Sequence, residues 1–459
     1  FRKWTFRTVP KGRTVPEGSG SFSYSRNIPR QGNRFCLRIC LGILIFWLHE
    51  RGQKYMWGAI GVAAAFLVII VLVTRKVALG YALLAGSFIA AISSGFTPWG
   101  FLVTSAKTLI QPATLNLIST LVLISILGSW MKELGILDRM VDALEKVLRS
   151  AKLTIMVVPS IMGTLLVTGG AIMAAPMVNS MGDRINLSNE RRAAINLLFR
   201  HAWYFIFPFA PSFILVKEIA NIEIKQLILI QLPLTIVAVV SGYYAWLRDV
   251  KEDNGQAEPP TKEDYLNLLR YTSPLWSSLV LGLGFGVPFQ LALLVGLGLA
   301  LYYGRPSLQA IPSMLLRGVQ VPILLSGVGI MIFKEILSSG DTLGSLTTGL
   351  LGLGLPLAVI VILLPALVSF ISASSTSAIG ITLPLLLPAM QQTNHLLLFT
   401  AGVYCAAFLG YFSSPLHLCQ VLTLEFFQVK MHDLYKEYVL PVSAMWIALI
   451  AILGIGQLL

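Results

Sequence analysis

The chain has 459 residues, of which 56% are hydrophobic and only 12% are charged, whereas about a quarter of the residues in an ordinary soluble domain are charged. This composition excludes a large water-facing surface. Of the net charge of +13, residues 1–55 carry +9, and no basic patch interleaved with aromatic residues indicates a nucleic-acid partner. We therefore predict an all-α polytopic membrane protein whose solvent is the lipid bilayer.

Residues 1–55 differ from the rest of the chain. They are rich in Arg, Ser, Gly and Pro without a helical period, and Met56 leads directly into the first apolar run. We interpret residues 1–55 as a basic N-terminal extension outside the native fold. A secretory leader with Cys40–Leu48 as its apolar core is the alternative.

From Met56 onward, apolar runs predict membrane helices by their length. A first membrane repeat at 56–247 is followed by a polar stretch at 248–270, interpreted as a cytoplasmic linker, and by a second repeat at 271–459. The pattern of Gly135–Ser150 predicts an amphipathic helix at the membrane interface. The expected spans are Gly58–Val73, Leu79–Gly95, Leu115–Met131, Ala193–Val216 and Leu227–Leu247, then Pro274–Pro288, Leu291–Tyr303, Val319–Phe333, Leu396–Leu424 and Val439–Leu458.

The two halves also resemble each other residue by residue. Met131-Lys132-Glu133-Leu134 recurs 202 positions later as Phe333-Lys334-Glu335-Ile336, and Leu198-Phe199 recurs as Leu398-Phe399. An ordered series of such matches indicates an internal repeat. Each half further contains a pair of apolar segments that are short for spans, namely Leu153–Val167 with Ala171–Gly182, and Leu355–Ile371 with Ala378–Met390.

We interpret each short pair as a re-entrant hairpin, which gives each half five spans plus one hairpin. Because five is odd, the second half is inverted in the membrane. With Arg75-Lys76 inside, 18 basic residues fall on the inner side and four on the outer, as the positive-inside rule requires. Two full crossings in place of each hairpin would preserve this charge pattern.

The hairpin tips carry the predicted solute chemistry. Backbone that leaves helical form at membrane depth lines a cavity or is buried in protein. The helix that starts at each tip directs N–H groups toward the site, which favours an anion such as a carboxylate. The free carbonyls suit a bound Na⁺ equally well. The predicted substrate-binding residues of the tips are Thr168, Gly169, Gly170, Ser374, Ser375, Thr376 and Ser377.

Two helices are interrupted at Pro-Ser sequences, which we name the first break (Phe207–Ser212) and the second break (Tyr411–Pro415). Proline frees main-chain carbonyls, so both breaks are candidate cation sites, and each is expected to face the tip of its own hairpin. A kink that only shapes helix packing is the alternative. The residues concerned are Pro211, Ser212, Ser413, Ser414 and Pro415.

Arg200 is the most distinctive single residue. It follows Arg192 by eight positions, about 12 Å deeper along a helix, and a charge inside a membrane is a functional hypothesis by default. Arg200 could bind a substrate carboxylate or phosphate, or form a salt bridge that only stabilises the fold. His201 and His417 are candidate proton carriers, with a structural role as the alternative.

Other chemistries find little support in the sequence. No HExxH motif, no GxSxG within a span and no paired intramembrane carboxylates are present, so we predict no enzyme and no catalytic residues. Cys36, Cys40, Cys405 and Cys419 form neither a CxxC pair nor a metal cluster by spacing and are interpreted as small apolar residues. We predict no metal and no cofactor apart from a bound Na⁺.

The serine-rich segment Ser372-Ala373-Ser374-Ser375-Thr376-Ser377-Ala378-Ile379-Gly380, with the repeat and the hairpins, resembles the ion transporter superfamily. Within it the chain is similar to an uncharacterised prokaryotic integral membrane family akin to gluconate permeases. Gly169-Gly170 departs from the Ser-Asn-Thr tips of dicarboxylate members. The resemblance implies transport of an organic anion with H⁺ or Na⁺ by a homodimer in the inner (plasma) membrane.

Inverted repeats have a mechanistic meaning, because two such halves can exchange conformations and open a central site to either side. We therefore predict a secondary active transporter for a small organic anion, coupled to H⁺ or Na⁺ by alternating access. A channel for ions or solutes and a non-transporting membrane scaffold are the alternatives. Gradient-driven saturable uptake, ohmic current, or neither of the two distinguishes these three classes.

Overall fold

A computed structural model describes residues 60–164, 170–251, 259–339 and 355–457, without the side chains of 170–173. These residues belong to a compact unit that extends from Lys54 to Leu459. The predicted extension at 1–55 and the tip residues Thr168 and Gly169 lie outside the described residues. Every regular element in the described ranges is a helix, as the sequence predicts.

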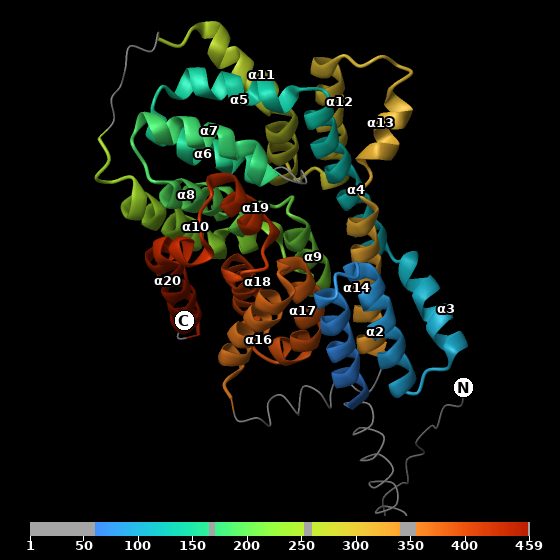
Figure 1. Ribbon diagram of the computed structural model, residues 1–459. Helices are drawn as coiled ribbons and strands as arrows, with labels where there is room; N and C mark the ends of the chain where they lie inside the picture. Colours follow the sequence, from blue (N-terminus) through green and yellow to red (C-terminus); the bar gives the residue numbers. More distant parts are fainter. Residues whose placement is uncertain (1–59, 165–169, 252–258, 340–354, 458–459) are drawn as a thin grey trace, which may run out of the picture. The chain divides into compact units, whose positions relative to one another are not determined.

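The first half contains short and long helices in a fixed order (Figure 1). Its helices are Ile60–Thr74, α2 (Leu79–Ser93), α3 (Pro98–Leu109), α4 (Pro112–Glu133), α5 (Ile136–Leu148), α6 (Ala151–Thr164), α7 (Gly170–Arg184), α8 (Asn189–Ala202), η1 (Trp203–Phe205), α9 (Pro211–Ala220) and α10 (Ile224–Trp246).

The second half follows a closely similar order. Its elements are α11 (Lys262–Leu279), η2 (Val280–Gly284), α12 (Phe289–Gly304), α13 (Ile311–Gly318), α14 (Val321–Ser339), α16 (Leu357–Ser372), α17 (Ser375–Gln391), α18 (Leu396–Ser413), α19 (Leu418–Phe427) and α20 (Met431–Gly456). In both halves a long helix precedes a helical hairpin, an interrupted helix and a final long helix.

Five helices among the described residues are long and apolar enough to cross a membrane: α4, α10, α14, the interrupted helix Leu396–Phe427, and α20. Ile60–Thr74, α2, α6, α12 and α16 are apolar but shorter. The length and composition of these helices agree with a membrane protein, and the amphipathic prediction for 135–150 is confirmed by α5, whose Ile136, Leu137, Met140 and Leu144 are buried.

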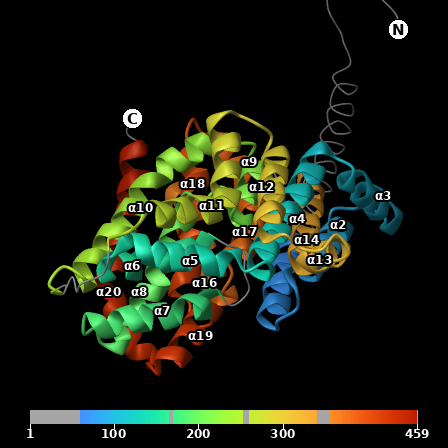
Figure 2. The ribbon, with the colours of Figure 1, turned by 90° about the horizontal axis from the view of Figure 1, so that it is seen from above.

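Packing between the halves is reciprocal. Helix α2 packs against α14 while α4 packs against α12, and α9 packs against α17 while α19 packs against α7. Helix α8 contacts α20 while α10 contacts α18. The views in Figures 1 and 2 agree that α2, α4 and α14 lie side by side. Each half therefore completes its packing on the other, so that neither forms a separate core.

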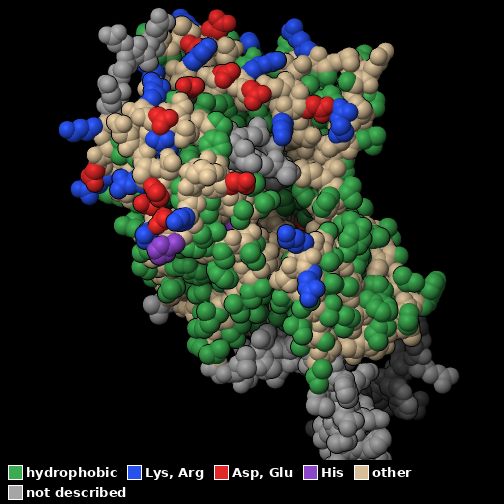
Figure 3. All heavy atoms as spheres, in the orientation of Figure 1, with side chains coloured by type: hydrophobic (Ala, Val, Ile, Leu, Met, Phe, Trp, Pro, Cys, Tyr) green, Lys and Arg blue, Asp and Glu red, His purple; other side chains and the backbone are tan. Residues whose placement is uncertain are grey.

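The charged residues are distributed unevenly. In Figure 3, Lys, Arg, Asp and Glu side chains gather over the end of the face that carries α5, α11 and α13, whereas hydrophobic side chains predominate over α2, α3, α14 and α16. Exposed apolar side chains such as Leu363 and Leu367 on α16, at 58% and 59%, fit a lipid environment better than water. This distribution is typical of a membrane protein.

Polar contacts join residues expected on the same side of the membrane. Arg317 at the end of α13 pairs with Glu133 at the end of α4, and both are expected inside. The ammonium group of Lys334 on α14 donates to the main-chain carbonyl of Glu218 on α9 at 3.0 Å. Lys334 and Lys217, the residue before Glu218, are both expected on the outer side. These contacts show which residues lie together, and the assignment of sides stays a prediction.

Helix α11 begins at Lys262, within the stretch 248–270 that we interpret as a linker. The cause is local. The side chain of Thr261 accepts a hydrogen bond from the main-chain N–H of Asp264, and the Asp264 carboxylate accepts one from the N–H of Thr261. This reciprocal capping box starts a helix eight residues before the predicted end of the linker.

The residue matches proposed between the halves are also out of register with the structure. The C-caps of α9 and α19, Asn221 and Gln428, share a left-handed backbone and are 207 positions apart, as are the first residues of α10 and α20. The predicted partners Leu198 and Leu398 differ by only 200 positions. Leu198 therefore lies well inside α8, whereas Leu398 lies in the first turn of α18. Helix ends identify equivalent positions better than these short identities.

Candidate functional site

A cavity of about 320 Å³ lies among helices from both halves of the chain. Its polar lining comes mainly from the tip of the hairpin formed by α16 and α17, through Ser374, Thr376 and Ser377. The other lining residues are Leu79, Leu117, Leu121, Tyr204, Pro211, Leu215, Pro322, Ile323, Ser326, Gly327 and Ile330. None of the lining residues is charged, so the cavity is a largely apolar space whose polar side chains carry hydroxyl groups.

The tip that reaches the cavity has a defined local structure. Helix α16 ends at Ser372, its C-cap Ala373 adopts a left-handed backbone with φ 51°, and Ser374 then caps α17. The side-chain oxygen of Ser374 accepts hydrogen bonds from the N–H of Ser377 at 3.1 Å and from the Ser377 hydroxyl at 2.7 Å. This cap occupies Ser374 and Ser377, whereas the hydroxyls of Ser375 and Thr376 make no hydrogen bond within the described residues. Of these two, Thr376 lines the cavity, and Ser375 is buried without lining it.

The first break reaches the same cavity. Pro211 is the first residue of α9 and lines the cavity together with Ser374 and Thr376 of the second hairpin. The tip of the first hairpin lies largely outside the described residues, so the expectation that the first break faces its own tip stays a prediction, and the structure adds that this break meets the tip of the second hairpin. The physical reason is the reciprocal packing of the halves, which places α9 on α17.

The neighbouring Ser212 does not line the cavity. Its hydroxyl is buried and lies 3.4 Å from the hydroxyl oxygen of Tyr404 on α18. The Tyr404 hydroxyl in turn donates to the main-chain carbonyl of Tyr204 at 2.6 Å. Tyr404 thus satisfies a carbonyl that the interruption between α8 and α9 leaves free, and it ties the first break to the second half of the chain.

The second break has different partners. The Ser414 hydroxyl donates to the main-chain carbonyl of Phe370 on α16 at 2.7 Å, and Tyr435 donates to the carbonyl of Ser413 at 2.9 Å. Pro415 is exposed. No residue of this break lines the cavity of the second tip. The carbonyls freed at the second break are therefore satisfied at least in part by protein donors.

Arg200 is buried but does not line this cavity. Its guanidinium donates to the main-chain carbonyl of Met162 on α6 at 3.0 Å. Helices α6 and α8 approach closely there, as shown by the fact that a Cβ added to Gly163 would lie only 1.8 Å from the carbonyl oxygen of Arg200.

Of the predicted residues of the first tip, only Gly170 lies in the described residues, as the first residue of α7.

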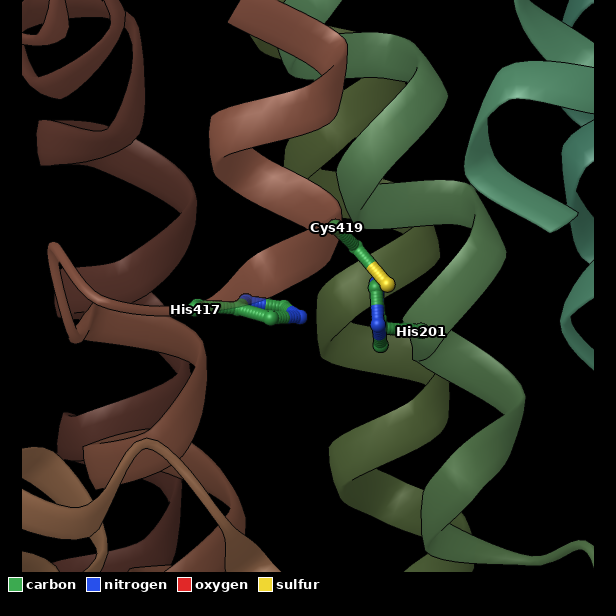
Figure 4. A group of neighbouring side chains, drawn as sticks. All are labelled: His201, His417 and Cys419. Carbon is green, nitrogen blue, oxygen red and sulfur yellow. The ribbon is translucent and has the colours of Figure 1, made fainter. Parts of the chain in front are cut away.

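The two predicted proton carriers meet in a buried cluster. The rings of His201 on α8 and His417 just before α19 lie 4.9 Å apart between centroids, and the thiol of Cys419 joins them (Figure 4). Aromatic rings of Tyr204, Phe408, Tyr411 and Phe412 surround His201. The Nδ1 atom of His201 lies 2.7 Å from the carbonyl oxygen of Leu197.

Sequence reasoning missed three residues of this region. Tyr204 lines the cavity and also packs on His201, so it links the cavity to the histidine cluster. Tyr404 carries no local signal, because a single Tyr in an apolar run is ordinary, and Cys419 was interpreted as a small apolar residue. The position of Cys419 two residues after His417 was the one hint of a shared cluster.

A second cavity, of about 360 Å³, lies at the contact of α5, α6, α7 and α11. It is more polar than the first, with Lys146, Arg149 and Arg184 beside Glu145 and Asp264. It contains no residue predicted to bind solute. We therefore take the first cavity and the adjoining histidine cluster as the candidate functional site.

Comparison with known proteins gives a family for the chain. A family model described as "Protein of unknown function (DUF401)" matches residues 59–455, and the chain belongs to this family. A search of curated proteins found no match. The match begins after the predicted N-terminal extension and includes both halves, the cavity and the histidine cluster.

Proposed function

We propose that this member of the DUF401 family is a secondary active transporter for a small organic anion, a carboxylate, in the inner (plasma) membrane. The observation that carries the proposal is the cavity at the tip of the second hairpin. Its volume of about 320 Å³ is at the lower end of the range of small-molecule sites, about 300–1,000 Å³. The solute is therefore small.

The preference for an anion rests on the start of α17. The first N–H groups of a helix lack partners within the helix and carry a partial positive charge. In α17 the Ser374 side chain accepts from one of them, the N–H of Ser377, and the hydroxyl of Thr376 adds a donor at the cavity. Since the lining has no charged side chain, a carboxylate here would be held by the helix end and hydroxyl groups rather than by an ion pair.

The proposed mechanism is alternating access between two inverted repeats. Its support is the reciprocal packing, in which α9 lies on α17 while α19 lies on α7. The cavity is lined by both halves, through α4 and α9 on one side and α14 and α17 on the other. A change in how the halves pack would therefore change the access to the cavity.

The transport proposal is tested by uptake into proteoliposomes. Thr376→Val removes the cavity hydroxyl at nearly constant volume. A hydrogen bond to a charged group contributes about 1.5–3 kcal/mol, so the apparent affinity should fall about 10- to 100-fold. The matched control is Thr382→Val on the same helix, whose hydroxyl donates to Ala378 within α17 and does not line the cavity.

The outcomes separate the candidate functions. Saturable uptake that requires an H⁺ or Na⁺ gradient and weakens only in Thr376→Val supports the transporter, and collapse of each gradient in turn identifies the coupling ion. Ohmic current would instead indicate a channel. Absence of both uptake and current, with no small carboxylate raising the thermal stability of the purified protein, would contradict the proposal.

The inverted topology is tested by cysteine labelling. Arg184 at the end of α7 and Gln392 just after α17 are both exposed and occupy corresponding places after the two hairpins. In a variant without other cysteines, Arg184→Cys should react with an impermeant thiol reagent from the inner face and Gln392→Cys from the outer face. Reaction of both from one face would exclude inversion.

A further inference from the structure

The histidine cluster contains a set of three potential metal ligands from two places in the sequence. His201 comes from α8, His417 is the N-cap of α19, and Cys419 lies in the first turn of α19. Their ligand atoms all lie within 4.8 Å of one another. Figure 4 shows the His417 ring directed toward His201, with the sulfur of Cys419 beside the His201 ring.

The orientation of His201 suits a metal ligand. A carbonyl oxygen can only accept a hydrogen bond, so the contact of 2.7 Å between His201 Nδ1 and the Leu197 carbonyl places the ring proton on Nδ1. The other nitrogen, Nε2, then carries a free lone pair. Histidines that bind metals are typically held in this way, with the second nitrogen donating to a carbonyl or carboxylate.

His417 supplies an independent observation. It is 0% exposed, and neither of its ring nitrogens makes a hydrogen bond of good geometry within the described residues. The carbonyl of Phe412 is the main-chain group that lies near it. Leaving a buried polar group unpaired costs about 1–3 kcal/mol. A bound ligand that accepts the imidazole lone pair would remove this penalty.

The distances are close to those of a metal site. Ligand atoms that bind one ion at about 2.0–2.3 Å lie less than about 4 Å from one another. The three ligand atoms now lie within 4.8 Å of one another. Side-chain rotations that move each atom by less than about 1 Å would bring them into that range. Tyr411, whose ring lies 4.0 Å from that of His417, covers the cluster from α18.

The charges at the site select among metals. Cys419 is the only acidic ligand in the group, and Arg200 adds a positive charge beside the two histidines. With a thiolate, a monovalent ion gives a neutral site, whereas a divalent ion leaves one positive charge buried next to Arg200. Uncompensated charge at such a place is costly. Thiolate and imidazole ligands together accept Cu⁺.

We propose that His201, His417 and Cys419 form a binding site for a monovalent soft metal ion, Cu⁺, that links α8 to the start of α19. Binding displaces the thiol proton of Cys419 and involves no electron transfer. The site is separate from the cavity of the proposed function, and its existence does not depend on transport. Its place between the interrupted helices means that the bound ion would hold the two halves together.

The proposal is tested with Ag⁺, a redox-inert ion of the same charge as Cu⁺. The full chain is purified with Cys36 and Cys40 replaced by Ser, so that these two thiols do not bind the probe. We expect one Ag⁺ per chain after desalting. Cys419→Ser and His417→Gln should each weaken binding by more than about 100-fold, because loss of an outer-shell partner alone costs about 10–100-fold.

The controls are the buried Cys405→Ser on α18 and the exposed His432→Gln on α20, which should retain one Ag⁺. Absence of bound Ag⁺, or an equal loss in Cys405→Ser, would overturn the site. Preference for Zn²⁺ over Ag⁺ would overturn the assignment to a monovalent ion. X-ray absorption spectroscopy of the Cu⁺-loaded parent chain tests the site without depending on the folding of any variant. We expect one sulfur and two nitrogen ligands.

Discussion

The two breaks occupy equivalent places in the two halves but have different surroundings. The first break directs Pro211 to the cavity and leaves Ser212 in a long contact of 3.4 Å with Tyr404. The second break is anchored by Ser414 to α16 at 2.7 Å, exposes Pro415, and leads to His417 in the histidine cluster. A repeated backbone path can therefore carry different chemistry, because the side chains at each break meet different partners.

The largest expected effect concerns a contact that both halves share, the crossing of hairpin and interrupted helix. Gly163 on α6 meets the Arg200 backbone, and Gly410 on α18 meets the Ala366 backbone. Since a Cβ at Gly163 would lie 1.8 Å from a carbonyl oxygen, Gly163→Ala should lower the free energy of unfolding by about 3 kcal/mol or more. Thermal unfolding in detergent measures the loss.

The control for this prediction is Gly298→Ala on α12, where an added Cβ would meet nothing within 4 Å. That change should be neutral or stabilising by up to about 1 kcal/mol, because Ala favours the helix. Gly410→Ala should resemble Gly163→Ala, since its Cβ would lie 2.2 Å from the carbonyl oxygen of Ala366. If only one of these two substitutions lowered the stability, the halves would differ in how closely their helices pack as well as in the side chains at their breaks.

A smaller loss of stability is expected when the serine of each break is replaced, and its size should differ between the two breaks. Ser414→Ala removes a short, buried hydrogen bond and should cost about 1–3 kcal/mol, whereas Ser212→Ala removes a contact of 3.4 Å and should cost about 0.5 kcal/mol. The midpoint of chemical unfolding of the two variants gives this ranking. Equal losses in the two variants would mean that the breaks are held equally, contrary to the comparison.

The smallest effect concerns the start of the second half, away from both breaks. Hydrogen bonds from the hydroxyl and main-chain N–H of Thr261 hold the pKa of Asp264 below its usual range, with a further contribution from Lys146 on α5. A lowered pKa means that the carboxylate stabilises the helix start above the usual Asp pKa, about 3.9. This contribution is lost as the pH falls through the lowered value.

Amide hydrogen exchange of Tyr265 and Leu266, corrected for the intrinsic effect of pH, measures this loss. Protection in the first turn of α11 should decrease below about pH 4, and Asp264→Asn should show weaker protection at neutral pH. The control is Glu263→Gln, because Glu263 makes no hydrogen bond within the described residues. Unchanged protection in Asp264→Asn would refute the role of the capping box.

Much of the fold could be predicted because it depends on local signals. The lengths of apolar runs identified α4, α10, α14 and α20 as long membrane helices, and the charged face of α5 identified it as amphipathic. The tip at Ser374 was predictable as well, since Ser is a preferred N-cap. Each of these predictions needs only residues within one or two turns of chain.

The parts that the sequence did not predict depend on contacts between distant segments. The first break meets the tip of the other hairpin because α9 packs on α17, which no short window of sequence contains. The partnership of His201 with His417 crosses 216 positions. Arg200 was predicted to lie inside the membrane. The structure buries it in protein, and its hydrogen bond to the carbonyl of Met162 on α6 was not predicted.

By itself the sequence predicted a lipid environment, and it determined the all-helical class and the places where helices must stop. These follow from hydropathy, proline and capping residues, which act over a few residues and are independent of the rest of the chain. Only the tertiary structure decided which side chains meet. The cavity and the His201–His417–Cys419 cluster exist because the halves pack reciprocally, and side-chain contacts across such an interface depend on helix register in both halves at once.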